Sequence, residues 1–149
     1  MQDIIIGSDH RGFELKQQIK DFLREKKILL IDVGANDTKT VDYPVIVKEV
    51  VECVISAKHF CGILICGSGI GVSIAANKYK GIRAALCHTV AGAKSAREHN
   101  DANVLCLGCD GADIENLKKI INTFLNTKLL PDEKYKRRIE MLDKIISTN

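Results

Sequence analysis

The sequence predicts an α/β protein: a five-stranded parallel sheet covered by helices on both faces, with an extra helix at the C-terminal end. Five short apolar segments rich in β-branched residues alternate with longer segments whose apolar residues recur every three or four positions. Glycine or polar residues follow the apolar segments. Because strands alternate with helices, right-handed crossovers would make the strands parallel.

The expected strands are continuous apolar runs, as is usual for parallel strands that are buried on both faces. The first is the clearest, because three consecutive isoleucines, Ile4 to Ile6, precede Gly7. The five runs cover residues 3–7, 28–33, 62–65, 82–87 and 104–107.

The expected helices carry an apolar stripe along one side. Residues 45–56 are the ambiguous case, because their many β-branched residues would also suit a strand. Pro44 precedes them, and proline is favoured in the first turn of a helix. Their charged residues also fall opposite an apolar set, which we expect to be buried: Val47, Val50, Val51, Val54 and Ile55. The helices are expected at residues 13–26, 45–56, 72–78, 90–99, 113–126 and about 132–147.

The bulk properties limit the classes of function. A chain of 149 residues, 46% hydrophobic and 28% charged, is long enough for a single folded domain, residues 1–149. The net charge of +3 and the absence of Trp argue against a nucleic-acid surface. No apolar run approaches the roughly 20 residues that span a membrane, and no signal peptide is apparent. Six cysteines in such a chain favour reduced thiols, so we expect a cytoplasmic protein.

The stretch from Cys61 to Gly71 is the most informative part of the chain. Its apolar run stops at Cys66, and glycines follow at alternate positions, Gly67, Gly69 and Gly71, before a helical segment. Glycines allow backbone amides to approach a ligand closely, and the start of a helix adds partial positive charge. The pattern predicts a reactive thiol beside a loop that binds an anionic group.

Other polar residues follow the expected strands. Asp9 and His10 come after the first strand, His88 after the fourth, and Cys109 with Asp110 after the fifth. Ligands of parallel α/β sheets bind beyond the carboxyl ends of the strands, so these residues are candidates for the same site. Since nothing in the sequence pairs with His88 or His59, we interpret both as structural.

Each motif also has a structural interpretation. The glycine spacing differs from that of a dinucleotide-binding loop, whose last gap is two residues. Asp9 and His10 could cap a helix, and His99 could be a surface residue at a helix end. Cys106 and Cys109 have the spacing of a redox or zinc pair, but they end a strand and no second pair exists. We therefore expect no metal site.

Taken together, the motifs resemble those of type B ribose-5-phosphate isomerase and its relatives that act on galactose and allose 6-phosphates. The resemblance implies a Rossmann-like three-layer α/β/α fold, a homodimer or a pair of dimers, and active sites shared between subunits, with the C-terminal helix at the interface. It also implies an aldose–ketose isomerisation without metal or organic cofactor. The matching motifs are Gly7–Gly12, Asp42–Pro44, Ile65–Lys78, Gly81–Ala84 and His99–Leu105.

The resemblance also implies a role for individual residues. Cys66 would be the base that moves a proton between carbons, with the Ser68 hydroxyl helping to hold its thiol. His99, assisted by Asp9, would open the sugar ring. The remaining substrate-binding positions would be His10, Tyr43, Asn100 and the loop Gly67, Ser68, Gly69, Ile70 and Gly71.

The phosphate-binding positions depart from the family. Asp110 stands where the family usually has an arginine, and Lys134 stands where the first of the later arginines is expected. Arg137 and Arg138 match the others. We therefore expect Lys134, Arg137 and Arg138 to bind the phosphate of a small phosphorylated sugar.

The choice of sugar stays open at this point. Ribose 5-phosphate is the first hypothesis, and a six-carbon sugar phosphate is the second. A non-catalytic module that binds phosphosugars or nucleotides, or a hydrolase with Cys66 as nucleophile, would suit some of the same residues.

Overall fold

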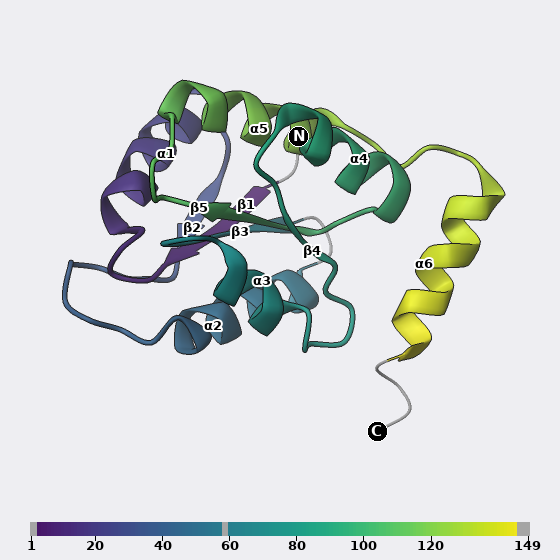
Figure 1. Cartoon of the computed structure of the whole chain (residues 1–149), viewed down its shortest axis with the longest axis horizontal. Helices are drawn as coiled ribbons and strands as arrows, with labels where there is room; N and C mark the ends of the chain where they lie inside the picture. The colour runs from purple at the N-terminus through teal and green to yellow at the C-terminus, as the bar shows by residue number, and fades with distance from the viewer. Residues whose placement is uncertain (1–2, 58–59, 146–149) are drawn as a thin grey trace.

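The computed structural model describes residues 3–57 and 60–145, and these form three layers around one sheet (Figure 1). The five strands are all parallel and lie in the order β2-β1-β3-β5-β4. Their bounds are β1 (Asp3–Ser8), β2 (Leu30–Asp32), β3 (Phe60–Cys66), β4 (Ala84–Leu86) and β5 (Val104–Gly108). The predicted α/β/α sandwich with its five-stranded parallel sheet is confirmed.

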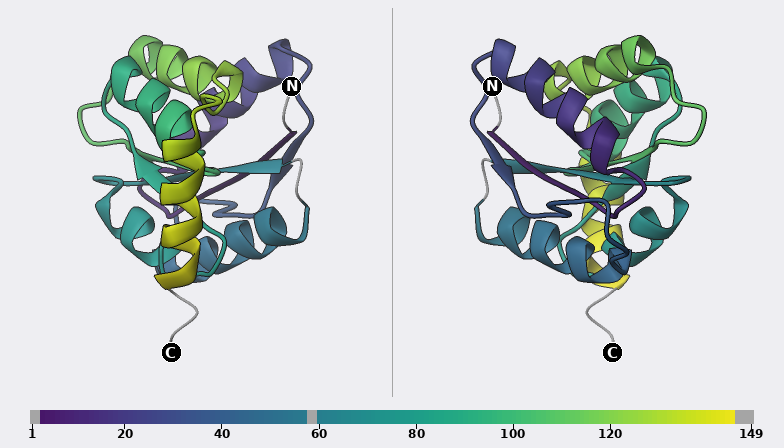
Figure 2. Two further views of the ribbon diagram at one scale, coloured as in Figure 1. Left: turned by 90° about the vertical axis from the view of Figure 1, so that its right-hand side faces the viewer. Right: turned by 90° about the vertical axis from the view of Figure 1, so that its left-hand side faces the viewer.

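The helices divide between the two faces of the sheet, with α1, α4 and α5 on one and α2 and α3 on the other (Figure 1). The sixth helix, α6, runs across the edge of the sheet from the α4 side towards the α2 side (Figure 2). The helix bounds are α1 (Phe13–Glu25), α2 (Tyr43–Ser56), α3 (Ile70–Ala76), α4 (Val90–Asn100), α5 (Ile114–Asn126) and α6 (Glu133–Ile145). None of the described helices is long and apolar enough to cross a membrane.

The two faces of the sheet carry separate apolar clusters. Along β1, Ile4 and Ile6 face α1 and α5, whereas Ile5 faces α2, as the alternation of side chains in a strand requires. All three are at most 1% exposed. Burying such a side chain contributes about 1.5–3 kcal/mol, so these strands hold the layers together.

Two predicted strands are shorter than expected. The run 28–33 yields only β2, and the run 82–87 yields only β4. Both strands lie at the edges of the sheet and pair on one side only, so fewer of their residues are held in the ladder.

The predicted buried face of α2 is correct except at one residue. Val47, Val50, Val51 and Val54 are buried, but Ile55 is exposed. On a helix of 3.6 residues per turn, Ile55 lies about 80° from Val47, at the border of the stripe.

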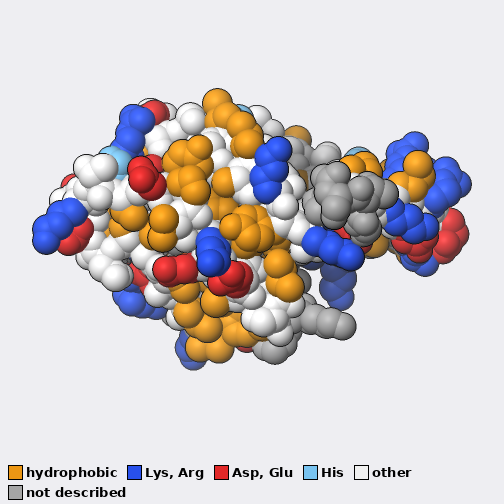
Figure 3. All heavy atoms as spheres, turned by 90° about the horizontal axis from the view of Figure 1, so that it is seen from below, with side chains coloured by type: hydrophobic (Ala, Val, Ile, Leu, Met, Phe, Trp, Pro, Cys, Tyr) orange, Lys and Arg blue, Asp and Glu red, His pale blue; other side chains and the backbone are white. Residues whose placement is uncertain are grey.

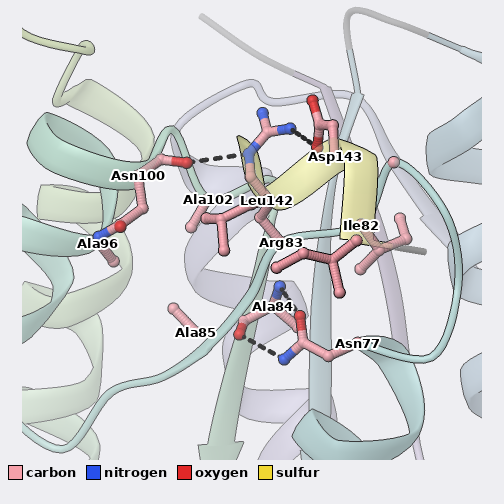
Figure 4. Close-up of a pocket in the computed structure, with 12 residues that line it drawn as sticks. Asn77, Ile82, Arg83, Ala84, Ala85, Ala96, Asn100, Ala102, Leu142 and Asp143 are labelled. Atoms are coloured by element: carbon pink, nitrogen blue, oxygen red, sulfur yellow. Dashed lines mark hydrogen bonds and ion pairs between the residues drawn. The ribbon is translucent and has the colours of Figure 1, made fainter. Parts of the chain in front are cut away.

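Helix α6 differs from the others because none of its described residues is buried. It is held to the rest of the chain by an ion pair of 3.4 Å between Arg83 Nη1 and Asp143 Oδ1 (Figure 4). Its apolar residues Met141, Leu142 and Ile145 are exposed. The predicted residues 146 and 147 of this helix lie outside the described part of the chain.

Candidate active site

A crevice is expected where the chain leaves neighbouring strands for opposite faces of a sheet. β1 leads to α1 on one face, and its neighbour β3 leads to α3 on the other. Asp9 and His10 follow β1, and Cys66 ends β3. The Asp9 amide donates to the carbonyl of Ile65 at 3.1 Å, so the two strand ends are directly joined.

The thiol of Cys66 is held by the backbone of the glycine loop. Its Sγ accepts a hydrogen bond of 3.2 Å from the amide of Gly69, and the residue is 5% exposed. The amide fixes the sulfur at the edge of the glycine loop. The donor is available because Gly69 adopts φ +77, a conformation suited to glycine.

Ser68 does not hold the thiol as expected. Its Oγ accepts from the amide of Ile70 at 3.2 Å, at the start of α3, and the described residues include no hydrogen bond from it to Cys66. In this structure the amide of Gly69, and not the hydroxyl of Ser68, contacts the sulfur. Ser68 is exposed at the mouth of the loop, where it can contact a ligand.

Buried thiols elsewhere are poor bases. Burial raises the pKa of Cys61 to about 12 and that of Cys87 to about 11. Burial also raises the pKa of Cys106, which lies against the same apolar layer as Cys66. These thiols therefore stay neutral at physiological pH and pack as small apolar groups. Among residues 3–57 and 60–145, no three potential ligands gather in a way that could hold a metal ion.

Asp9 both caps a turn and borders the crevice. Its Oδ1 accepts from the amide of Gly12 at 3.0 Å, and the residue is 6% exposed. His10 is half-buried, with Nδ1 3.3 Å from the amide nitrogen of Val41. The same Nδ1 lies 3.4 Å from the carbonyl oxygen of Val41, so it can accept from the amide or donate to the carbonyl, depending on the tautomer.

Tyr43, the first residue of α2, lies over the start of α3. A methyl group at Gly71 would lie 2.8 Å from Cζ and 3.1 Å from Oη of Tyr43. The absence of a side chain at Gly71 thus makes room for the phenol, and Tyr43 is beside the loop as expected.

Lys16 was not among the predicted residues, yet it supports this edge of the site. It is completely buried, and its Nζ donates to Asp32 Oδ1 and to the carbonyls of Gly34 and Ala35, each at 2.6 Å. The same two residues pair with Ser8: the Ser8 amide donates to Gly34, and the Ala35 amide donates to Ser8. Lys16 therefore fixes the turn at Gly34 and Ala35, and this turn holds the backbone of Ser8, the residue before Asp9.

A signal for this lysine exists in the sequence. Lys16 lies three and seven residues before Ile19 and Leu23, so it falls on the buried stripe of α1. Burial lowers the pKa of Lys16, and the hydrogen bond to Asp32 opposes this shift. A lysine on an apolar stripe needs such a carboxylate.

The predicted residues His99 and Asn100 lie at the other end of the sheet. They end α4, just before β5 begins, whereas Cys66 pairs with Gly108 at the end of β5. Four strand residues separate the two levels, or about 13 Å along the sheet. One chain therefore does not bring His99 to Cys66.

The basic residues of α6 lie at the same end of the sheet as His99. The ring of His99 stacks on that of Tyr135, with centroids 4.7 Å apart and planes 14° from parallel. Lys134 Nζ lies 4.7 Å from the same ring centroid and pairs with Asp132 at 2.9 Å. Arg137 and Arg138 are exposed on the same helix.

A cavity of about 450 Å³ separates α6 from the edge strand β4 (Figure 4). Apolar side chains such as Ala96 and Leu142 line much of it, together with Asn100, whose carbonyl accepts from Arg83 Nε at 2.9 Å. The face that carries α2 and α3 also displays many apolar side chains (Figure 3). Ile70 and Ile74 of α3 are more than half exposed.

A second cavity, of about 480 Å³, opens on the α5 side of the glycine loop. Ser68, His88, Asp110 and Asn116 are among its lining residues. His88 is exposed there, which differs from its interpretation as a structural residue. His59 lies outside the described residues.

Comparisons with known proteins identify the family and the fold of the chain. Residues 4–142 match the model of the family described as Ribose/Galactose Isomerase. Ribose-5-phosphate isomerase B of Escherichia coli is 38% identical over 145 residues, 97% of each chain. Galactose-6-phosphate isomerase subunit LacB of Clostridium acetobutylicum is 36% identical over 146 residues, 98% of this chain and 84% of that one. The solved structure of Clostridium thermocellum Ribose-5-Phosphate Isomerase B superimposes with a TM-score of 0.94 at 41% identity, covering 97% of each chain.

Proposed function

The chain belongs to the Ribose/Galactose Isomerase family, and we propose that it interconverts ribose 5-phosphate and ribulose 5-phosphate. The observation that carries this proposal is the thiol of Cys66, held by the Gly69 amide in the crevice between β1 and β3. The similarity to proteins named ribose-5-phosphate isomerase B favours the five-carbon sugar.

In the proposed reaction, the Cys66 thiolate removes the proton on C2 of the open-chain aldose and returns it to C1. A second proton moves from the hydroxyl on C2 to the oxygen on C1, so the aldehyde becomes an alcohol and C2 becomes the ketone. The enediolate between these steps carries negative charge on oxygen. Amides of the loop from Gly67 to Gly71 would donate to it, and each such donor contributes about 3 kcal/mol to similar reactions.

Ring opening precedes this proton transfer. His99 would move a proton from the anomeric hydroxyl to the ring oxygen, with Asp9 assisting, because imidazole can give and take protons near neutral pH. Asn100, His10 and Tyr43 would bind the sugar hydroxyls.

We propose that a second copy of the chain completes each site. Cys66 and His99 lie at opposite ends of the sheet, so a two-fold axis that pairs opposite ends would create two equal sites. Exposed apolar residues on α3 and α6, the unpaired side of β4 and the cavity beside α6 support such an interface. Lys134, Arg137 and Arg138 would then bind the phosphate of a substrate that reacts at the other chain's thiol.

The six free thiols support a cytoplasmic location for this enzyme.

The test is an assay of the wild type and Cys66→Ala with ribose 5-phosphate in deuterated water. We expect conversion with deuterium incorporated at the exchanged carbon, and a loss of at least about 100-fold in kcat for the variant. Full activity of Cys66→Ala would refute the role of the thiol. Faster conversion of galactose or allose 6-phosphate than of ribose 5-phosphate would favour the six-carbon reaction instead.

A further inference from the structure

An arginine that the predicted site does not include lies directly over the glycine loop. A methyl group at Gly67 would lie 2.5 Å from Nη1 and 2.7 Å from Cζ of Arg11. Arg11 follows β1, and Gly67 follows β3, so the guanidinium spans the crevice between these strands. The close approach is possible because Gly67 has no side chain.

The guanidinium is held from one side. Its Nη2 donates to both oxygens of Asp110, at 2.7 and 2.9 Å. Asp110 is fixed in turn, because its amide donates to the carbonyl of Gly67 at 2.9 Å. Nε and Nη1 of Arg11 make no hydrogen bond to residues 3–57 or 60–145, and 56% of the side chain is exposed. The pair therefore presents the free N–H groups of Nη1 and Nε to solvent at the rim of the loop.

The position of Arg11 relative to the thiol indicates which part of a ligand it would contact. The Cys66 side chain packs on the α2 side of the sheet, whereas Gly67 and Asp110 line the cavity on the α5 side of the loop. Arg11 lies on that second side, with the backbone of the loop between its guanidinium and the sulfur. A group that reacts at Cys66 and a group that contacts Arg11 must then be different ends of one ligand.

We propose that Arg11 is a substrate-binding residue that contacts the phosphate of the sugar phosphate, and that Asp110 is the positioning residue that holds its guanidinium. The inference rests on the proposed function, which supplies a ligand with a phosphate at the end remote from the reacting carbons. The charged guanidinium still has free N–H groups on Nη1 and Nε, and such groups donate charge-assisted hydrogen bonds to phosphate oxygens. The exposed pair contributes little to folding, since ion pairs of this exposure are worth about 0–1 kcal/mol.

The test compares Arg11→Met with Arg24→Met. Arg24 is a matched control, because it is also an exposed arginine (62%) that pairs with an aspartate, Asp21, at 3.2 Å, and it lies on α1, the helix that follows Arg11. We expect Arg11→Met to raise KM for ribose 5-phosphate and the inhibition constant of inorganic phosphate by about 10- to 100-fold, with a smaller change in kcat. Arg24→Met should leave both constants unchanged, and both variants should unfold at the wild-type temperature.

Asp110→Ala tests the second half of the proposal. The freed guanidinium keeps its charge but loses its fixed position, so KM should rise, though less than in Arg11→Met. A KM below that of the wild type would show that Asp110 competes with the phosphate and would overturn its positioning role. Unchanged phosphate inhibition in Arg11→Met would overturn the role of Arg11.

Calorimetric titration of inorganic phosphate into the wild type and Arg11→Met separates this inference from the proposed reaction. Weaker phosphate binding by Arg11→Met would support the inference even if the wild type converted no sugar phosphate. Equal binding by both proteins would refute it even if the enzyme were an active isomerase.

Discussion

The amide of Gly69 donates a hydrogen bond of 3.2 Å to the sulfur of Cys66. The donor belongs to the backbone, so its position depends on the conformation of the loop and not on a side chain. Gly69 adopts φ +77, and Leu86 and the backbone of Leu107 occupy the space that a Cβ at this position would need. The reactivity of the thiol is thereby linked to the packing of the loop against β4 and β5.

Gly69→Ala should therefore impair both folding and catalysis. The new methyl group would lie 2.6 Å from Leu86 Cδ1 and 2.9 Å from the carbonyl carbon of Leu107. We expect a loss of about 1–3 kcal/mol in the free energy of unfolding from strain, together with a large fall in kcat. Urea unfolding and the isomerase assay measure the two effects.

Gly111→Ala is the control for backbone strain alone. Gly111 also has a positive φ, +65, but nothing lies within 4 Å of the added methyl group. It should lose roughly 1 kcal/mol and keep its kcat. Equal kcat values in Gly69→Ala and the wild type would contradict the link between this loop and the thiol.

Asp32 should be essential for stability, because its carboxylate balances the positive charges of two lysines. It accepts from Lys16, which is completely buried, and from Lys20. Asp32→Asn would leave the Lys16 ammonium without a buried counter-charge, which typically costs about 3–5 kcal/mol. Asp37→Asn, at an exposed carboxylate that pairs with Lys39 at 3.7 Å, should change the unfolding free energy by less than about 1 kcal/mol.

The Asp32 carboxylate should also make the free energy of unfolding depend on pH. Hydrogen bonds from Lys16 and Lys20 hold the pKa of Asp32 below its ordinary value of 3.8, although burial opposes them. A lowered pKa means that the stabilisation is complete above about 3.8 and is lost as the pH falls through the pKa of the folded state. Urea unfolding between pH 6 and 2 should show this loss in the wild type and not in Asp32→Asn. Parallel pH curves for the two proteins would contradict it.

Mixed dimers test whether the sites are shared. Cys66→Ala and His99→Asn should each be nearly inactive when expressed alone, since each removes one half of every site. Random pairing on co-expression makes half of the dimers mixed, and each mixed dimer has one intact site of two, so about a quarter of the wild-type activity should return. A co-expressed pair no more active than the separate variants would indicate that each site belongs to one chain.

Much of the fold could be predicted because the signals are local. Apolar runs and stripes identified the strands and helices, and the position of Cys66 at the end of a strand followed from residues next to it in the chain. The edge strands and Ile55 were misjudged because their environment depends on neighbours in the sheet and on the border of a helix face.

The sequence by itself determined the layers of this protein, the thiol beside a glycine loop and the resemblance to an isomerase family. Only the tertiary structure decided which candidates meet. It separated His99 from Cys66, because a helix that follows one strand returns to the opposite end of the sheet before the next strand begins. It also joined Arg11 to Asp110, 99 residues apart, over Gly67. Such contacts depend on how distant segments pack, which no local pattern of residues records.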